Sequence, residues 1–329
     1  MRLLRLPLPC ALALLLLACG RQAPPQAEVV AADGVLCDLS QRLAGADLQV
    51  ECLLQPGEDP HQLQLTPRQS QALRQARLVL INGYGLTPAL ADQRGAIAVA
   101  ELAVPDSPPL SAKGDHGHDH GHRHSGAHSA AHGESERDPH VWHDPRQAAA
   151  MVAVVSRQLQ QLEPAAAAAI AARAQAMQNT LAALHRWNQQ QFASLPAPRL
   201  LASGHRSFAS LARAYQLQEL PLVDGGSSAE VLRPQALQAN LSRLRQQPPA
   251  RLFAEQLPAS RSLQRVSALS GIPIATEPLQ ADGLAPASGG KADLISTLTA
   301  NTCLIAEQLQ GRCNRRSQQQ LIERWQAIR

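Results

Sequence analysis

Short apolar runs alternate with amphipathic helical patterns near both ends of the chain. The first set of runs is EVVAA, LQVECLL, ARLVLING and AIAVAEL, and helical patterns such as LCDLSQRLAG and TPRQSQALRQA lie between some of them. The second set is RLLASG, LQELPLV, ARLFAEQ and PIATEP, accompanied by SFASLARAYQL, PQALQANLSRLRQQ and a final ADLISTLTANTCLIAEQLQG. Strands that alternate with helices predict βαβ units and mainly parallel sheets.

The middle of the chain has a helical pattern only. One pattern begins at Pro145, and a second follows Pro164 and continues to about Ser194. About thirty residues rising 1.5 Å each give a rod of roughly 45 Å, which suits a strut between two lobes. The apolar stripe of this rod comprises Ile170, Met177, Leu181 and Leu184.

These patterns predict an α/β protein with two lobes, each a mainly parallel sheet flanked by helices, joined by one long rigid helix. We expect the N-terminal lobe in residues 28–160, the linking helix in residues 161–195 and the C-terminal lobe in residues 196–329.

The N-terminus is typical of an exported protein. A basic start, MRLLR, precedes a short apolar core, which predicts a signal peptide over residues 1–18 rather than a membrane span. LLAC, ending at Cys19, resembles the bacterial lipobox, whose cysteine is lipidated, although a plain signal peptide is the alternative. Residues 19–27 then read as a flexible tether.

Four cysteines remain for the mature chain. In an exported protein they suggest two disulfides, and three pairings are possible. We favour the short loops Cys37–Cys52 and Cys303–Cys313. A four-cysteine zinc site is the competing interpretation, but the chain has no CxxC.

Nine of the 12 histidines lie between Gly114 and Pro145. The Gly- and Ser-rich part, residues 112–137, has low complexity and little to bury, so we expect a mobile loop that binds metal weakly. Its histidines are His116, His118, His120, His122, His124, His128 and His132.

Composition and motifs narrow the chemistry. The net charge of +4, without a basic cluster interleaved with aromatics, argues against nucleic-acid binding. HExxH, P-loop, GxSxG and dinucleotide-binding glycine patterns are all missing from the sequence.

Three other histidines share one kind of position. His61 and His205 each follow a predicted strand, and His140 lies in DPHVWHDP, where two Asp-Pro pairs bracket a turn before a helix. Neutral imidazoles on separate rigid elements can converge on one borderline cation. A carboxylate is the natural fourth ligand, and Glu277 in PIATEPLQ is the candidate.

Four segments, in order, resemble the signatures of the zinc/manganese ABC-transporter solute-binding proteins. They are LLQPGEDPHQLQLTPRQSQALRQARLVLINGYGL, DPHVWHDPRQA, SGHRSFASLARAYQL and ARLFAEQLPASRSLQRVSALSGIPIATEPL. The resemblance implies a metal site in the cleft between the lobes, with His61, His140 and His205 as ligands. Glu277 stands where the family usually has Asp, and Glu58 is a second-choice carboxylate. His143 is an unusual extra in the second signature.

The resemblance also implies a function and partners. Three imidazoles and at most one carboxylate suit Zn²⁺ better than Mn²⁺, which is the alternative. We expect a monomeric, lipid-anchored protein in the periplasm or on the cell surface that delivers zinc to an ABC-transporter permease, and no enzyme. The remaining alternatives are an adhesin or metal-buffer lipoprotein, and a metallohydrolase with Glu58 as its base.

Overall fold

The first lobe is built on a parallel sheet. The computed structural model describes residues 27–110, 137–223, 233–286 and 292–329. The sheet has the strand order β2-β1-β3-β4, and every strand pair is parallel. Its elements are β1 (Val29–Ala31), α1 (Gly34–Ala44), β2 (Val50–Cys52), α2 (Pro67–Gln75), β3 (Leu78–Ile81), β4 (Ile97–Ala98) and α3 (Val99–Ala103).

Local sequence explains how this lobe begins. The three residues of β1 are fully buried, as expected of a central parallel strand covered on both faces. Asp33 then caps α1 by accepting a hydrogen bond from the amide of Leu36 at 2.9 Å. A disulfide joins Cys37 on α1 to Cys52 at the end of β2. The helix is thus attached to the strand that leads toward His61.

The second lobe has a shorter regular sheet than the sequence predicts. β5 and β6 pair in parallel, whereas ARLFAEQ and PIATEP contribute only a parallel bridge between Leu252 and Ile274. The amide of Phe253 still donates to the carbonyl of Ala202 at 2.8 Å, so this segment lies beside β5. The elements are β5 (Leu200–Ser203), α6 (Ala209–Tyr215), β6 (Gln218–Pro221), α7 (Pro234–Gln246), α8 (Arg261–Ser270), α9 (Leu294–Gln308) and α10 (Arg315–Gln326).

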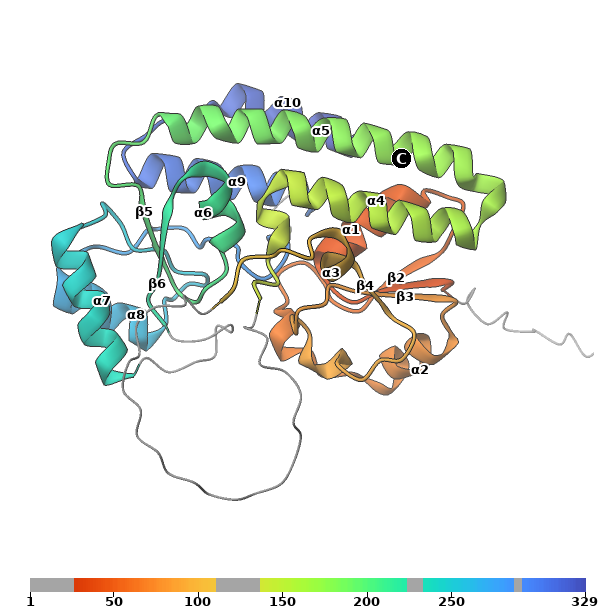
Figure 1. The fold of residues 1–329 in the computed structure, drawn as a ribbon, viewed down its shortest axis with the longest axis horizontal. Coiled ribbons are helices and arrows are strands. Elements are labelled where there is room, and N and C mark those ends of the chain that lie inside the picture. The colour runs from red at the N-terminus through yellow and green to blue at the C-terminus, as the bar shows by residue number, and fades with distance from the viewer. Residues whose placement is uncertain (1–26, 111–136, 224–232, 287–291) are drawn as a thin grey trace, which may run out of the picture.

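Two antiparallel helices, α4 (Pro145–Leu162) and α5 (Ala167–Ala193), form the middle of the chain. The 27 residues of α5 span about 40 Å, and Figure 1 shows this helix running along both lobes. Leu181 packs in the core of the first lobe, while Phe192 packs in a core of the second. The prediction of two α/β lobes linked by a long helix is confirmed.

The last two helices return to the first lobe. α9 contributes Leu298 to the core of the first lobe and Ile305 to a core of the second. On α10, Trp325 is fully buried in the first core, so part of residues 196–329 packs outside the second lobe. The end of α10 accordingly lies against α1, where Arg42 donates to the carbonyl of Trp325 at 2.7 Å. The second disulfide joins Cys303 to Cys313, so both favoured pairings are present.

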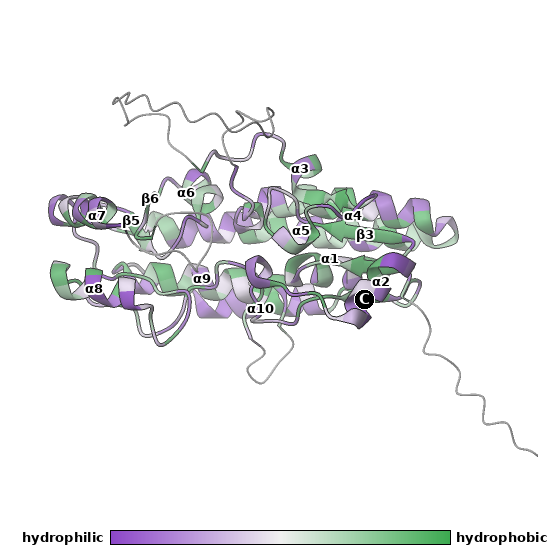
Figure 2. Cartoon of the chain, turned by 90° about the horizontal axis from the view of Figure 1, so that it is seen from below, coloured by the Kyte–Doolittle hydropathy of each residue, from purple (hydrophilic) through white to green (hydrophobic). Residues whose placement is uncertain are grey.

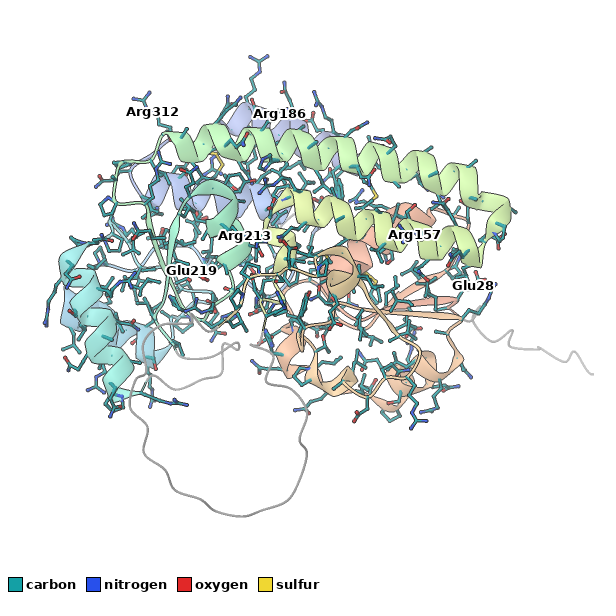
Figure 3. All side chains as sticks on the ribbon, viewed as in Figure 1. Glu28, Arg157, Arg186, Arg213, Glu219 and Arg312 are labelled. Atoms are coloured by element: carbon teal, nitrogen blue, oxygen red, sulfur yellow. A yellow bond between two sulfur atoms is a disulfide. The ribbon has the colours of Figure 1, made fainter. Side chains whose placement is uncertain are left out.

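Few large hydrophobic side chains of the described residues are exposed. α7 and α8 carry both hydrophilic and hydrophobic residues, whereas β3 is hydrophobic (Figure 2). Arg186 and Arg312 project from the outer edge near α5 (Figure 3). Among the described residues, no helix combines the length and apolarity needed to cross a bilayer. The predicted signal peptide, Cys19, nearly all of the tether and the seven loop histidines lie outside the described residues.

Candidate metal centre

Three histidines and one aspartate converge between the lobes. One ligand atom from each of His61, His140, His205 and Asp282 lies within 4.8 Å of the other three. Oδ1 of Asp282 lies 3.3, 3.0 and 3.1 Å from the Nε2 atoms of His61, His140 and His205, in that order. Four ligands at about 2.0 Å from a tetrahedral metal ion are roughly 3.3 Å apart, so this spacing suits one shared cation.

Each of the three histidines lies near the point where a helix or strand begins or ends. His61 lies in the 3-10 turn Pro60–Gln62, which follows β2, and the carboxylate of Asp59 accepts its amide hydrogen at 2.8 Å. His205 follows β5, and His140 precedes the 3-10 turn Val141–His143 at the start of α4. In parallel α/β folds, ligand residues gather at the carboxyl ends of strands, which accounts for His61 and His205.

Asp138 orients His140 and links it to the second lobe. Its Oδ1 lies 2.9 Å from Nδ1 of His140 and also accepts the amide hydrogen of His140 at 2.9 Å. Its Oδ2 accepts hydrogen bonds from the amide and hydroxyl of Ser210 on α6, at 3.2 and 3.0 Å. A carboxylate only accepts, so Nδ1 carries a proton, and Nε2 is the nitrogen that would offer its lone pair to a metal ion.

Glu255 does the same for His205. One carboxylate oxygen accepts from Nδ1 of His205 at 2.7 Å, and the other accepts from its backbone amide at 3.0 Å. A Cβ atom on Gly204 would lie 2.6 Å from the carboxylate of Glu255, so a side chain at this position would displace that carboxylate. The Nε2 atoms of His61 and His205 are buried, and each faces Oδ1 of Asp282. Both are therefore available to a metal ion.

The charges in the site are strongly coupled. Burial alone would lower the pKa of His205, but its hydrogen bonds with Asp282 and Glu255 raise that pKa to about 11. The pKa of His140 is raised for the same reason, against burial, by Asp138 and Asp282. Burial alone would raise the pKa of Asp282, but hydrogen bonds with the three histidines hold it well below its usual value. Without metal, the site holds protons that a cation must displace.

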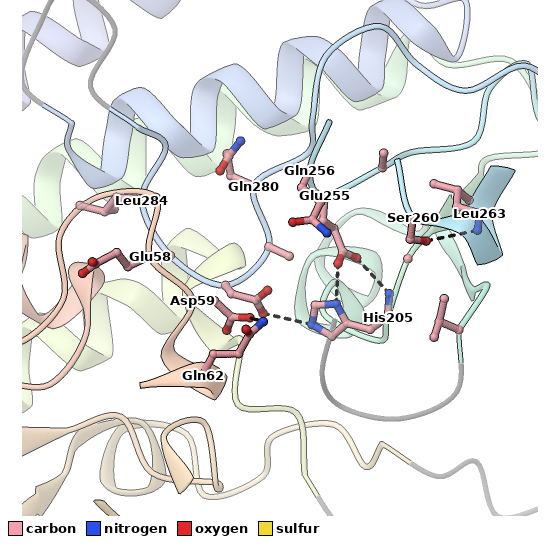
Figure 4. Close-up of a pocket in the computed structure, with 17 residues that line it drawn as sticks. Glu58, Asp59, Gln62, His205, Glu255, Gln256, Ser260, Leu263, Gln280 and Leu284 are labelled. Atoms are coloured by element: carbon pink, nitrogen blue, oxygen red, sulfur yellow. Dashed lines mark hydrogen bonds and ion pairs between the residues drawn. The ribbon is translucent and has the colours of Figure 1, made fainter. Parts of the chain in front are cut away.

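A cavity of about 160 Å³ adjoins the cluster. In Figure 4, Glu58, Asp59 and Gln62 of the first lobe lie opposite His205 and Glu255 of the second. Four carboxylates, Glu58, Asp59, Glu255 and Asp282, line it, and their charge favours a cation that approaches from this side.

The structure corrects the expectation for the fourth ligand candidate. Glu277 is exposed and lies outside the cluster, and its place is taken by Asp282, five residues further on. Glu58 lines the cavity, but its Oε2 accepts the amide hydrogen of Gln55 at 2.6 Å and it is not part of the cluster. The local signal for Asp282 in the sequence is an Asp-Gly pair after PIATEPLQ, which is typical of a turn.

Two further histidines have other partners. His185 on α5 lies with Nδ1 3.0 Å from the hydroxyl of Tyr215 and takes no part in the cluster. His143 is buried, and its Nε2 lies 2.9 Å from the carbonyl oxygen of Ala281. Burial lowers the pKa of His143 to about 4, so it is neutral at physiological pH.

Comparison with known proteins places these features in a family. Residues 29–308 match the family model ZnuA, described as zinc-uptake complex component A, periplasmic. The chain belongs to this family. Its members are substrate-binding components of metal transporters rather than enzymes, so the metallohydrolase alternative is excluded.

Individual relatives of the family carry different metals in their names. The zinc-binding protein TroA of Treponema pallidum is 29% identical over 65% of this chain. The match spans 66% of the length of TroA, slightly less than two thirds. The metal ABC transporter substrate-binding lipoprotein SloC of Streptococcus mutans is 23% identical over 82% of this chain and 87% of its own. The manganese-binding lipoprotein MntA of Bacillus subtilis is 26% identical over 60% of each chain.

The fold agrees with these relatives. A solved structure of the periplasmic zinc-binding protein TroA superimposes with a TM-score of 0.73 and 25% identity, covering 86% of this chain and 99% of that one. A structure of Fe(III)-bound YtgA from Chlamydia trachomatis gives the same TM-score at 19% identity, which supports the fold alone.

Proposed function

We propose that this protein captures Zn²⁺ between its lobes and delivers it to the permease of an ABC transporter. The observation that carries the proposal is the convergence of three buried imidazole nitrogens on one oxygen of Asp282. Because His61 comes from the first lobe and both His205 and Asp282 from the second, a bound cation would join the lobes. His140, at the boundary between them, would complete the ligand set.

The donor set favours zinc. Zn²⁺ readily takes four ligands with imidazole nitrogen and a carboxylate oxygen, whereas Mn²⁺ prefers six mainly oxygen ligands. The hydrogen bonds from Nδ1 to Asp138 and Glu255 raise the basicity of two imidazoles, which strengthens their bonds to a borderline cation. A manganese carrier is the second candidate, because relatives such as MntA are named for that metal.

Metal competition tests this choice. The purified, metal-free mature protein should bind one Zn²⁺ per chain tightly and retain it in the presence of a large excess of Mn²⁺. The measurement is titration against a chromophoric chelator of known affinity, followed by elemental analysis of the protein. Binding of Mn²⁺ as tight as that of Zn²⁺ would assign the manganese function instead, and binding of neither metal would refute a metal carrier.

The location of the protein follows from the transport role. A signal peptide over residues 1–18 and a lipid on Cys19 would hold the mature chain, as a monomer, at the membrane that contains the permease. Residues 19–27 would give the two lobes reach between the lipid and the transporter. The proposed compartment is the periplasm or the cell surface. Loss of membrane association in a Cys19→Ala protein, seen by fractionation, tests the anchor.

Zinc affinity should fall as the pH falls. The pKa values of His140 and His205 are raised in the metal-free site, that of His205 to about 11, so His205 is protonated at neutral pH and zinc must expel that proton. Each proton released makes the apparent affinity fall about tenfold per pH unit of acidification, since one pKa unit is a factor of ten. Calorimetry in two buffers of different ionisation enthalpy should detect at least one proton released per zinc ion. Equal binding heats in both buffers would contradict this expectation.

The His-rich loop should not be needed for tight binding. Its base is closed by an antiparallel bridge between Pro109 and Arg137 and by a hydrogen bond from the amide of Asp138 to the carbonyl of Pro108 at 2.7 Å. Deleting residues 114–134 should therefore leave the position of His140 and the affinity for the first zinc ion unchanged. We expect only weak additional binding to disappear in calorimetry. Loss of the tight site in the deletion variant would show that the loop supplies a ligand.

A further inference from the structure

His143 occupies an apolar position beside the metal centre. Its ring centroid lies 4.7 Å from that of Phe208 and 5.5 Å from that of Trp142, and the side chain is almost completely buried. A phenylalanine or leucine would fill such a pocket without the cost of burying polar nitrogens. The presence of an imidazole therefore calls for a specific interaction.

That interaction joins His143 to the loop that carries Asp282. Nε2 lies 2.9 Å from the carbonyl oxygen of Ala281, and a carbonyl only accepts, so Nε2 carries the proton and donates it. Nδ1 is then an acceptor, and it is buried without a hydrogen-bond partner in the described residues. The neutral imidazole thus makes a single hydrogen bond, to the residue directly before Asp282.

Two other contacts hold this loop, each at a residue that is not adjacent to Asp282 in the sequence. Asn301 on α9 pairs with both the amide and the carbonyl of Gln280, at 3.0 and 2.7 Å. On the far side, the amide of Gly57 donates to the carbonyl of Leu284 at 2.9 Å. The hydrogen bond from His143 fixes the carbonyl of Ala281, which lies between these two contacts. His143 belongs to the turn that directly follows His140. His143 therefore sets the distance between two ligand candidates, His140 and Asp282.

We propose that His143 is a positioning residue that holds Asp282 as a single-oxygen ligand and thereby favours Zn²⁺ over Mn²⁺; this inference rests on the proposed function. A single oxygen of Asp282, Oδ1, lies within 3.3 Å of all three histidine nitrogens. A carboxylate on a freely moving loop could turn both oxygens toward the cation. Such a change would raise the number of oxygen ligands and the coordination number of the metal ion. A site of that kind suits Mn²⁺ and no longer favours Zn²⁺.

Two matched variants separate the hydrogen bond from the filling of the pocket. His143→Phe retains an aromatic ring but cannot donate to the carbonyl of Ala281, whereas His143→Gln places an amide N–H near the position of Nε2. In the full mature protein, we expect His143→Phe to weaken Zn²⁺ binding about tenfold to a hundredfold, the range for residues that orient a ligand. Mn²⁺ binding should weaken less, so the ratio of the two affinities falls. His143→Gln should restore most of that ratio.

The measurement is chelator competition with Zn²⁺ and Mn²⁺ on wild type and both variants. The ratio of the two affinities is an internal control, because both metals are tested on the same folded sample. If His143→Phe does not fold, His143→Leu takes its place. An unchanged ratio in the variant without the donor, or equal changes in both variants, would overturn the inference. Wild-type protein that binds no Zn²⁺ would instead overturn the proposed function, so the two failures are distinct.

Discussion

Replacing Asp282 by alanine is expected to reduce zinc affinity by at least about a hundredfold, because losing a ligand costs no less than losing a residue that orients one. Oδ1 of Asp282 approaches all three imidazole nitrogens within 3.3 Å, so no other carboxylate in the cluster can replace it. Its removal also leaves the histidine Nε2 atoms without the negative charge that they face. Chelator competition at neutral pH measures the loss.

Glu277→Ala is the matched control for this experiment. It removes a carboxylate from the same connecting segment, but Glu277 is exposed and outside the cluster, so zinc affinity should stay at the wild-type value. Thermal unfolding of both metal-free variants checks that the fold is intact. Wild-type affinity in Asp282→Ala, together with loss in Glu277→Ala, would restore Glu277 as the fourth ligand.

The contrast between Asp282 and Glu277 shows which parts of the candidate site could be predicted from the sequence. His61 and His205 could be found because short apolar runs predict strands, and ligand residues gather where parallel strands end. His140 could be found because the Asp-Pro pairs around it predict a turn before α4. These are local signals, and the resemblance to family signatures reinforced each of them.

Asp282 could not be selected in the same way. It lies on irregular backbone, and the course of that backbone depends on contacts with distant residues, such as the hydrogen bonds of Gln280 with Asn301 and of Leu284 with Gly57. Glu277 follows PIATEP, a run that looks like a strand but forms only one bridge. A rule based on strand ends therefore selects a carboxylate that lies outside the cluster. Similarly, nothing local shows that α10 packs against the first lobe.

Asp38→Ala is expected to cause the largest loss of stability, about 3–5 kcal/mol, because it removes one partner from a buried ion pair. Nε of Arg42 donates to Oδ1 of Asp38 at 2.8 Å, and both side chains are largely buried. Oδ2 of Asp38 accepts from the indole nitrogen of Trp325 at 2.8 Å and from the amide of Leu294 at 3.0 Å. One carboxylate thus joins α1 to α9 and α10.

Denaturant unfolding of the metal-free protein measures this effect, with Glu307→Ala as the control. Glu307 pairs with Arg315 at 2.6 Å on the surface, where such a pair contributes about 1 kcal/mol at most. The Asp38 variant leaves the buried guanidinium of Arg42, 5.3 Å from the ring centroid of Trp325, with only the more distant carboxylate of Asp293, at 4.0 Å. A loss in Asp38→Ala no larger than in the control would mean that the C-terminal helices are held to the first lobe by apolar packing alone. In that case Trp325→Ala, rather than Asp38→Ala, should release them.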